Sequence, residues 1–184
     1  YSTVFNREGA RETVIPTYMG LIKQIDDQLG LLFAFMDEQG LTDETMVVFT
    51  SDHGDYLGDH WLGEKYLFHT PSVQVPLVIA DPSPACDATR GTVCDALVEL
   101  IDLAPTFVEV FGGVPPHVLE GRSLLPLLHG KATGWRQVVI SEYDYAFDLA
   151  RIKLAVPVPE ARLYMVYDGR FKYIHADGFA PMLY

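Results

Sequence analysis

An α/β fold is predicted for this 184-residue chain, and three observations predict it. Apolar residues first recur at helical spacing over residues 16–39 and then run continuously over residues 45–51, as in a buried strand. A second apolar run follows at residues 75–80, after a long loop. A further helical segment and a late hairpin complete the order helix, strand, strand, helix, hairpin, which is typical of a sheet with helices on both faces.

The first helix is expected to begin at Pro16 and to end before Gly40. Proline is tolerated in the first turn of a helix, and glycine is common just beyond the last turn. Residues 1–16 are polar and irregular, so we expect a connecting segment there. The apolar positions of the helix are Ile22, Ile25, Leu29, Leu32, Phe33 and Met36.

The segment between the two strands, residues 52–71, is rich in glycine, histidine, acidic and aromatic residues. A loop of this length without regular structure is usually either functional or disordered. Its aromatic residues favour an ordered loop, and we expect them to pack it rather than to line a pocket. They are Tyr56, Trp61, Tyr66 and Phe68.

The elements that follow the second strand are shorter. A strand is expected over residues 96–101, and a helix from residue 102 to residue 111 is closed by Gly112 and Gly113. A short helix is expected within residues 121–128, after a turn.

The last part of the chain is predicted to be rich in strands. Residues 137–143 form one expected strand, and Asp168-Gly169 between two apolar runs is a strong hairpin signal. We therefore expect two regions, an α/β part over residues 1–135 and a smaller antiparallel element over residues 136–184.

Composition excludes several classes of protein. About half of the residues are hydrophobic, which is enough to bury a core and argues against disorder. The formal net charge of −12 argues against a nucleic-acid-binding surface, which needs clustered lysine and arginine. No apolar run reaches the roughly 20 residues of a membrane-spanning helix, so no membrane partner is expected.

The two cysteines, Cys86 and Cys94, are too few for a disulfide framework. They either pair across the turn around Arg90 or remain reduced thiols, and we favour reduced thiols in a protein expected in the cytoplasm. The chain begins at Tyr1 rather than at methionine, so a piece of a longer protein is one interpretation.

Asp52 and His53 are the strongest candidates for a functional site. They follow the strand at residues 45–51 directly, and strand ends of α/β sheets are where such folds hold ligands. A carboxylate oxygen beside an imidazole nitrogen suits a divalent metal ion. A bend at this point would bring both side chains to one ion, and Gly54 allows such a bend at little conformational cost. Two ligands are not a complete site, so at least two more must come from elsewhere in the fold.

Other residues of the same loop add to this candidate site. Asp55, Asp59 and His60 are further potential ligands, although His60 equally suits orienting a neighbouring ligand. Lys65 suits binding of an anionic phosphoryl or sulfuryl oxygen, with an ordinary solvated lysine as the alternative. His69 is a candidate for substrate contact, and we favour a structural role for it.

The order of these motifs resembles the sulfatase branch of the alkaline phosphatase superfamily, and within it the phosphonate monoester hydrolases and arylsulfatases. The resemblance implies an alkaline phosphatase-like layered sheet with helices on both faces, present here as a partial fold with a small antiparallel hairpin element at its end. The matching segments, in order, are residues 25–30, SDHG at 51–54, LGDH at 57–60, Lys65, residues 71–79, DLAPT at 102–106, residues 121–128, Tyr173, and Leu183 with Tyr184.

By this resemblance, Asp52 and His53 are ligands of one divalent metal ion, which is manganese, calcium, magnesium or zinc. Lys65 contacts the transferring group, and Asp55, His60 and His69 are possible supporting residues around the ligands. The implied reaction is hydrolysis of a phosphonate monoester, a phosphodiester or a sulfate ester. An alkoxide-type nucleophile, often formylglycine, attacks the central atom.

The chain departs from the family pattern at the nucleophile. The family places it in a Cys/Ser-x-Pro-x-Arg motif well upstream, and neither Cys86 nor Cys94 lies in such a motif. We therefore expect the formylglycine-type nucleophile upstream in a longer protein, and we expect these 184 residues alone to be inactive. For the full-length enzyme, the resemblance implies a homo-oligomer that acts on a small anionic ester.

Three alternatives stay open at this point. They are a phosphotransferase or phosphomutase relative, a non-catalytic sulfatase-like scaffold domain, and a simple metal-binding module. The strand–loop–lysine spacing favours the sulfatase branch over the first. The presence of Asp52, His53 and Lys65 together argues against the second, and the missing ligands argue against tight metal binding by this chain alone. Sulfate, phosphonate and phosphodiester esters all remain open as substrates.

Overall fold

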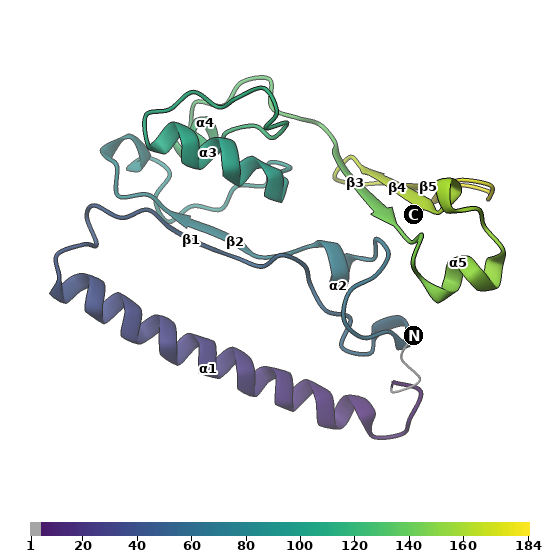
Figure 1. The fold of residues 1–184 in the computed structure, drawn as a ribbon. Helices are drawn as coiled ribbons and strands as arrows, with labels where there is room; N and C mark the ends of the chain where they lie inside the picture. Colours follow the sequence, from purple (N-terminus) through teal and green to yellow (C-terminus); the bar gives the residue numbers. More distant parts are fainter. Residues whose placement is uncertain (1–4) are drawn as a thin grey trace. The chain divides into compact units, whose positions relative to one another are not determined.

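The computed structural model describes residues 5–184 and divides the chain into two compact units. The first unit ends at Arg90 and the second begins at Gly91. In Figure 1 the first unit is drawn from purple to teal, and the second continues to yellow. The expected boundary of the two regions at residue 135 stays a prediction about the domains of the whole protein.

Helix α1, Ala10–Glu38, is 29 residues long and contains Pro16 in its interior. The prediction that the helix begins at Pro16 is therefore wrong, because residues 10–16, expected to be irregular, are helical. Residues 1–4 lie outside the described part of the chain. Proline lacks the N–H that would bond to the carbonyl one turn earlier, but a single missing bond does not end a helix of this length. Gly9, in a left-handed conformation with φ of 75°, precedes the first turn.

The expected end of α1 before Gly40 is confirmed. Gly40 has φ of 68°, and its N–H donates to the carbonyl of Asp37 at 3.1 Å. The N–H of Leu41 donates to the carbonyl of Met36 at 2.8 Å. This pair of bonds is the Schellman arrangement, in which a left-handed glycine lets the last carbonyls of a helix find donors. Despite its length, α1 lacks the apolar character that crossing a bilayer requires, as does every other helix of residues 5–184.

The two expected strands of the first unit are confirmed as β1, Val47–Thr50, and β2, Leu77–Ala80. They pair antiparallel, so that Thr50 lies opposite Leu77. The hydroxyl of Thr50 donates to the carbonyl of Pro76 at 2.7 Å, which closes the base of the loop between the strands. That loop contains the 3₁₀ turn η1, Asp59–Trp61, and the short helix α2, Thr70–Val73. The long loop therefore leaves and returns at one end of a two-stranded ribbon.

Apolar side chains of the first unit remain exposed. Phe49 and Val78 on the strands are 41% and 60% exposed. An open groove of about 540 Å³ lies between the end of α1 and the strands, lined by Phe33, Met36 and these two residues among others. The apolar positions of α1 that stay exposed are Met19, Leu21, Ile22, Ile25, Leu31, Leu32, Phe33 and Phe35.

The second unit begins with helices. After η2, Pro84–Cys86, at the end of the first unit, no strand forms over residues 96–101, so that expectation is wrong. Instead the 3₁₀ turn η3, Leu100–Asp102, begins there, because Glu99 and Asp102 form a reciprocal capping box. The expected helices are confirmed as α3, Leu103–Val110, and α4, Leu125–Leu128.

A four-stranded antiparallel sheet forms the rest of the second unit, with the strands in the order β3-β4-β5-β6. The expected strand and hairpin are confirmed. Helix α5 and the 3₁₀ turn η4, which lie between β3 and β4, were not expected from the sequence. The bounds are β3 Val139–Asp144, α5 Leu149–Leu154, η4 Val158–Glu160, β4 Arg162–Tyr167, β5 Lys172–Ala176 and β6 Met182–Leu183.

Asp168 organises the turn of the β4–β5 hairpin. Its Oδ1 accepts the backbone N–H groups of Phe171 at 2.6 Å and Arg170 at 2.8 Å, and these two hydrogen bonds lower the pKa of Asp168. Gly169 supplies the left-handed residue of the turn, with φ of 91°. Beyond the sheet, a small core gathers Tyr145, Ala146, Val156 and Ala161.

A buried ion pair joins the helical part of the second unit to the residues before β3. Asp102 is fully buried, and its carboxylate takes both guanidinium nitrogens of Arg136 at 2.6 Å. The same carboxylate accepts the backbone N–H groups of Glu99 and Arg122, each at 2.8 Å. Arg136 also lies 2.8 Å from the carboxylate of Glu99. All the oxygen lone pairs of this buried anion are thus engaged, as a buried charge requires.

Replacing Asp102 by alanine is expected to lower the free energy of unfolding by about 3–5 kcal/mol, because the buried Arg136 guanidinium loses its two-fold partner and keeps only Glu99, and the N–H groups of Glu99 and Arg122 lose their acceptor. The measurement is the urea unfolding curve of the purified protein. Asp87→Ala is the matched control, since Asp87 pairs with Arg90 at an exposed position and its loss should cost at most about 1 kcal/mol. Equal losses for the two variants would contradict the stabilising role of the buried pair.

Candidate functional site

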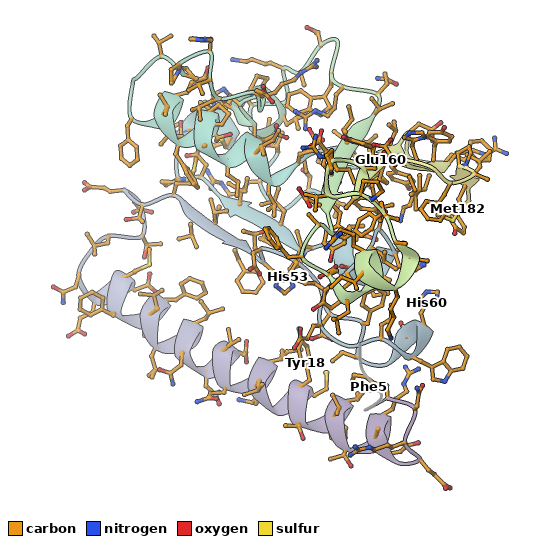
Figure 2. All side chains as sticks on the ribbon, turned by 45° about the vertical axis from the view of Figure 1, so that its right-hand side comes forward. Phe5, Tyr18, His53, His60, Glu160 and Met182 are labelled. Carbon is orange, nitrogen blue, oxygen red and sulfur yellow. The ribbon has the colours of Figure 1, made fainter. Side chains whose placement is uncertain are left out.

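Asp52 and His53 lie just beyond the end of β1, where the chain bends as expected. Figure 2 labels His53 at this position and His60 farther along the same loop. His53 Nε2 lies 3.5 Å from Asp52 Oδ2. The backbone N–H of His53 donates to the other carboxylate oxygen of Asp52 at 2.9 Å. The two side chains therefore turn to one side instead of alternating across an extended strand.

A third contact orients the imidazole. His53 Nδ1 lies 2.7 Å from the carbonyl oxygen of Gly54, and a carbonyl can only accept, so Nδ1 carries the hydrogen. In a neutral ring, Nε2 then carries the lone pair, and it lies 3.5 Å from the Asp52 carboxylate. Two acceptor atoms at this spacing favour a cation between them, either a proton on Nε2 or a metal ion. A backbone carbonyl bound to the other ring nitrogen is also a usual support for metal-ligating histidines.

The donor set of Asp52 and His53 fits a divalent metal ion. Ligand atoms at about 2.0–2.2 Å from one ion are separated by about 3–3.5 Å, which is close to the spacing of these two acceptors. The side chain of Asp52 is 83% exposed and that of His53 is 35% exposed, so further ligands can approach from outside this pair. The roles of both residues as ligands stay predictions.

Gly54 ties the beginning of the loop to its end. Its N–H donates to the carbonyl oxygen of Ser72 at 2.8 Å, and Ser72 is buried. A Cβ atom at Gly54 would lie 1.9 Å from the carbonyl oxygen of Pro71, well inside contact distance. Only glycine allows two backbones to approach this closely. The approach fixes the position of the Gly54 carbonyl, which orients His53.

The acidic residues farther along the loop are engaged by other parts of the protein. Asp55 Oδ1 accepts the backbone N–H of Leu57 at 2.8 Å and so forms a turn. Asp59 pairs with Arg11 near the beginning of α1 at 3.0 Å. Sequence reasoning missed Arg11 because it treated residues 1–16 as irregular. The contact fastens the loop to the helix at a half-exposed position.

The other two histidines of the loop, His60 and His69, lie against each other. The rings of His60 and His69 stack, with centroids 4.1 Å apart and planes inclined by 18°. His69 Nδ1 lies 2.8 Å from the phenol oxygen of Tyr56. These contacts agree with the structural role favoured for His69 from the sequence. Roles of His60, His69 and Asp55 beside the predicted metal ligands stay predictions.

The loop is ordered around buried aromatic rings. Tyr56 and Phe68 are 1% and 3% exposed, which confirms the expected packing for these two, whereas Trp61 is 69% exposed. The backbone is strained, because non-glycine residues with positive φ are costly. Within residues 5–184, every non-glycine residue with positive φ except Ala155 lies in this loop. Those in the loop are Leu57, His60, Trp61, Glu64 and Leu67.

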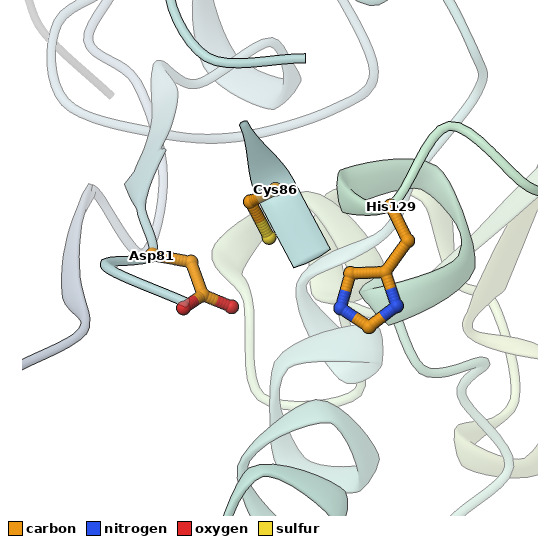
Figure 3. A group of neighbouring side chains, drawn as sticks. All are labelled: Asp81, Cys86 and His129. Atoms are coloured by element: carbon orange, nitrogen blue, oxygen red, sulfur yellow. The ribbon is translucent and has the colours of Figure 1, made fainter. Parts of the chain in front are cut away.

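Both cysteines are free thiols, as favoured from the sequence. Cys86 is buried and Cys94 is exposed. Burial raises the pKa of the Cys86 thiol to about 11, and the neighbouring carboxylate of Asp81 contributes to the same shift. Figure 3 shows Cys86 and Asp81 together. A thiol that stays protonated at neutral pH is a poor nucleophile, so Cys86 is poorly suited to that role.

Comparisons with known proteins place the chain in a family. Residues 1–114 match the sulfatase family model, and residues 58–177 match the model described as N-sulphoglucosamine sulphohydrolase, C-terminal. The chain therefore belongs to the sulfatase family of the alkaline phosphatase superfamily.

Individual relatives agree with this assignment. The multifunctional alkaline phosphatase superfamily protein PehA of Trinickia caryophylli is 38% identical over 181 residues, which cover 96% of this chain and 35% of PehA. An arylsulfatase of Clostridium perfringens is 34% identical over 131 residues, covering 71% of this chain and 27% of the relative. The chain thus spans about a third or less of the length of these curated relatives.

Solved structures confirm the fold class, an alkaline phosphatase-like fold of helices and antiparallel strands. The phosphonate monoester hydrolase of Agrobacterium radiobacter aligns with a TM-score of 0.83 at 35% identity, covering 91% of this chain and 34% of that one. The phosphonate monoester hydrolase SpPMH of Silicibacter pomeroyi aligns with a TM-score of 0.90 at 32% identity, covering 97% and 36%.

Replacing Gly54 by alanine is expected to displace either the backbone of Gly54 or that of Pro71, because the added methyl group would overlap the carbonyl. We expect a loss of about 1–3 kcal/mol in the free energy of unfolding, measured by chemical denaturation. Gly20→Ala is the matched control, since Gly20 lies in α1 with open space around its Cβ position. A Gly54→Ala protein as stable as the control would show that the close approach is absent.

Proposed function

We propose that this chain forms part of a metal-dependent hydrolase of phosphonate monoesters, phosphodiesters or sulfate esters. The observation that carries the proposal is the pair of facing acceptors, His53 Nε2 and Asp52 Oδ2, at the tip of β1. Membership of the sulfatase family supports it, together with relatives named as phosphonate monoester hydrolases and arylsulfatases.

Asp52 and His53 would hold one divalent ion, which is manganese, calcium, magnesium or zinc. Bound there, the ion would neutralise charge that develops on the reacting group and lower the pKa of the nucleophile. The Asp52 carboxylate contributes negative charge to the ion site. Gly54 and Ser72 fix the bend, so the His53 ring needs no rearrangement to direct Nε2 at the ion.

Lys65 would bind the anionic oxygen of the group that is transferred. Its ammonium is exposed and follows the acidic stretch of Asp52, Asp55 and Asp59. A lysine is a compact positive charge that suits a phosphoryl, phosphonyl or sulfuryl oxygen. The substrate that we propose is therefore a small anionic ester, in line with relatives named arylsulfatase and choline-sulfatase.

The nucleophile is proposed to lie in another part of the protein. Neither Cys86 nor Cys94 lies in the Cys/Ser-x-Pro-x-Arg pattern that resemblance associates with formylglycine. The relatives are about three times as long as this chain, since the aligned part is 35% of PehA and 36% of SpPMH. A formylglycine from that remaining part would meet the metal at Asp52 and His53.

Replacing Asp52 by alanine in the complete protein is expected to weaken metal binding at least about 10–100-fold, because a charged ligand is lost. Metal content after gel filtration, measured by elemental analysis, reads this out. Asp59→Ala is the matched control, because that carboxylate pairs with Arg11 and should leave the metal content unchanged. Full occupancy in the Asp52→Ala protein would exclude the assigned ligand.

Replacing Lys65 by methionine is expected to lower kcat/KM about 10²–10³-fold for 4-nitrophenyl sulfate or a 4-nitrophenyl phosphonate monoester, with the metal retained. The reason is the loss of a positive charge that stabilises the anionic transition state. Lys153→Met, at an exposed position of α5, is the matched control for charge and length. A Lys65→Met enzyme as active as the control would remove Lys65 from the site.

A further inference from the structure

We propose that Tyr56 is a positioning residue, which sets the place of Lys65 by holding the backbone on both sides of it. The inference rests on the proposed function of Lys65 as the contact of the anionic group. Tyr56 itself touches neither substrate nor metal in this proposal. It acts through the loop that carries the lysine.

Two hydrogen bonds from one residue bracket Lys65. The backbone N–H of Tyr56 donates to the carbonyl of Glu64 at 3.0 Å. The phenol of the same residue donates to the carbonyl of Tyr66 at 2.5 Å. Glu64 and Tyr66 are the residues directly before and after Lys65, so Tyr56 holds the peptide group that precedes the lysine and the Tyr66–Leu67 peptide group one residue beyond it.

The phenol is itself held in place. It is 1% exposed, and its oxygen lies 2.8 Å from His69 Nδ1. Because the phenol hydrogen goes to the carbonyl of Tyr66, the imidazole Nδ1 is the donor in this second bond. The ring also makes edge contacts with His69 and His60, with centroids 5.7 Å and 6.1 Å away. Burial raises the pKa of Tyr56, so the phenol remains protonated and able to donate.

The segment around Lys65 needs such a hold. Glu64 and Leu67 adopt positive φ values of 57° and 56°, which a chain without constraints would abandon. The lysine side chain is exposed, so the region that its ammonium can reach is set by where the backbone places its Cα atom. Small displacements of a group that binds the reacting centre reduce rates strongly.

The test is a double-mutant cycle in the complete, metal-loaded protein, with Tyr56→Phe, Lys65→Met and the double variant. Tyr56→Phe keeps the ring and the backbone N–H but removes the bonds of the phenol to Tyr66 and to His69. We expect kcat/KM for 4-nitrophenyl sulfate or a 4-nitrophenyl phosphonate monoester to fall about 10–100-fold. We expect the double variant to be no less active than Lys65→Met alone, because the phenol acts only through the lysine.

Three controls separate positioning from loss of structure. Tyr167→Phe removes another phenol-to-carbonyl bond, to Gly169 at 2.8 Å, on the β4–β5 hairpin and should leave kcat/KM unchanged. Metal content should be equal in all variants. Circular dichroism measures the folded fraction of each variant. Each activity assay is run at a temperature where the variant and the unmodified protein have the same folded fraction.

Each result has one meaning. A Tyr56→Phe effect that disappears in the Lys65→Met background supports the inference. Unchanged activity in Tyr56→Phe, or losses that multiply in the double variant, overturns the inference and leaves the proposed function standing. A Lys65→Met protein with unchanged activity overturns the proposed contact of Lys65, and this inference falls with it.

Discussion

The candidate site depends on a close approach between two stretches of backbone, at Gly54 and at Pro71-Ser72. The antiparallel pairing of β1 with β2 brings the two ends of the loop together, and the hydrogen bond from Gly54 to Ser72 holds them together beyond the strand ends. The carbonyl of Gly54 then orients His53, and the bend aligns His53 with Asp52. A side chain at Gly54 would disturb all of these contacts at once, because they share the same peptide groups.

Much of the fold followed from sequence patterns, and the failures have identifiable causes. The strands β1 and β2 were predictable because continuous apolar runs end sharply at polar residues. The beginning of α1 was misplaced because Pro16 is typical of a first turn, while the structure tolerates it inside a long helix. Residues 96–101 look like a strand, but Glu99 and Asp102 use their side chains to cap a helix start. Helix α5 is too short for its periodicity to stand out.

The site shows the same division between local and long-range information. Asp52 and His53 could be chosen because they are adjacent in sequence and directly follow an apolar run. The importance of Tyr56 could not be predicted, because its partners are defined only once the loop has folded back. These partners are Glu64, Tyr66 and His69. The pairing of Arg11 with Asp59 spans 48 positions and depends on a helical turn that the sequence did not reveal.

The apolar surface of α1 has a consequence for any study of this polypeptide by itself. Its uncovered leucine, isoleucine and phenylalanine side chains form a water-facing stripe far larger than isolated surface residues produce. Burying that stripe releases free energy whichever surface supplies the cover. While nothing covers this stripe, the polypeptide is expected to associate with its own copies or with chaperones. Its solubility therefore reports whether the stripe is covered.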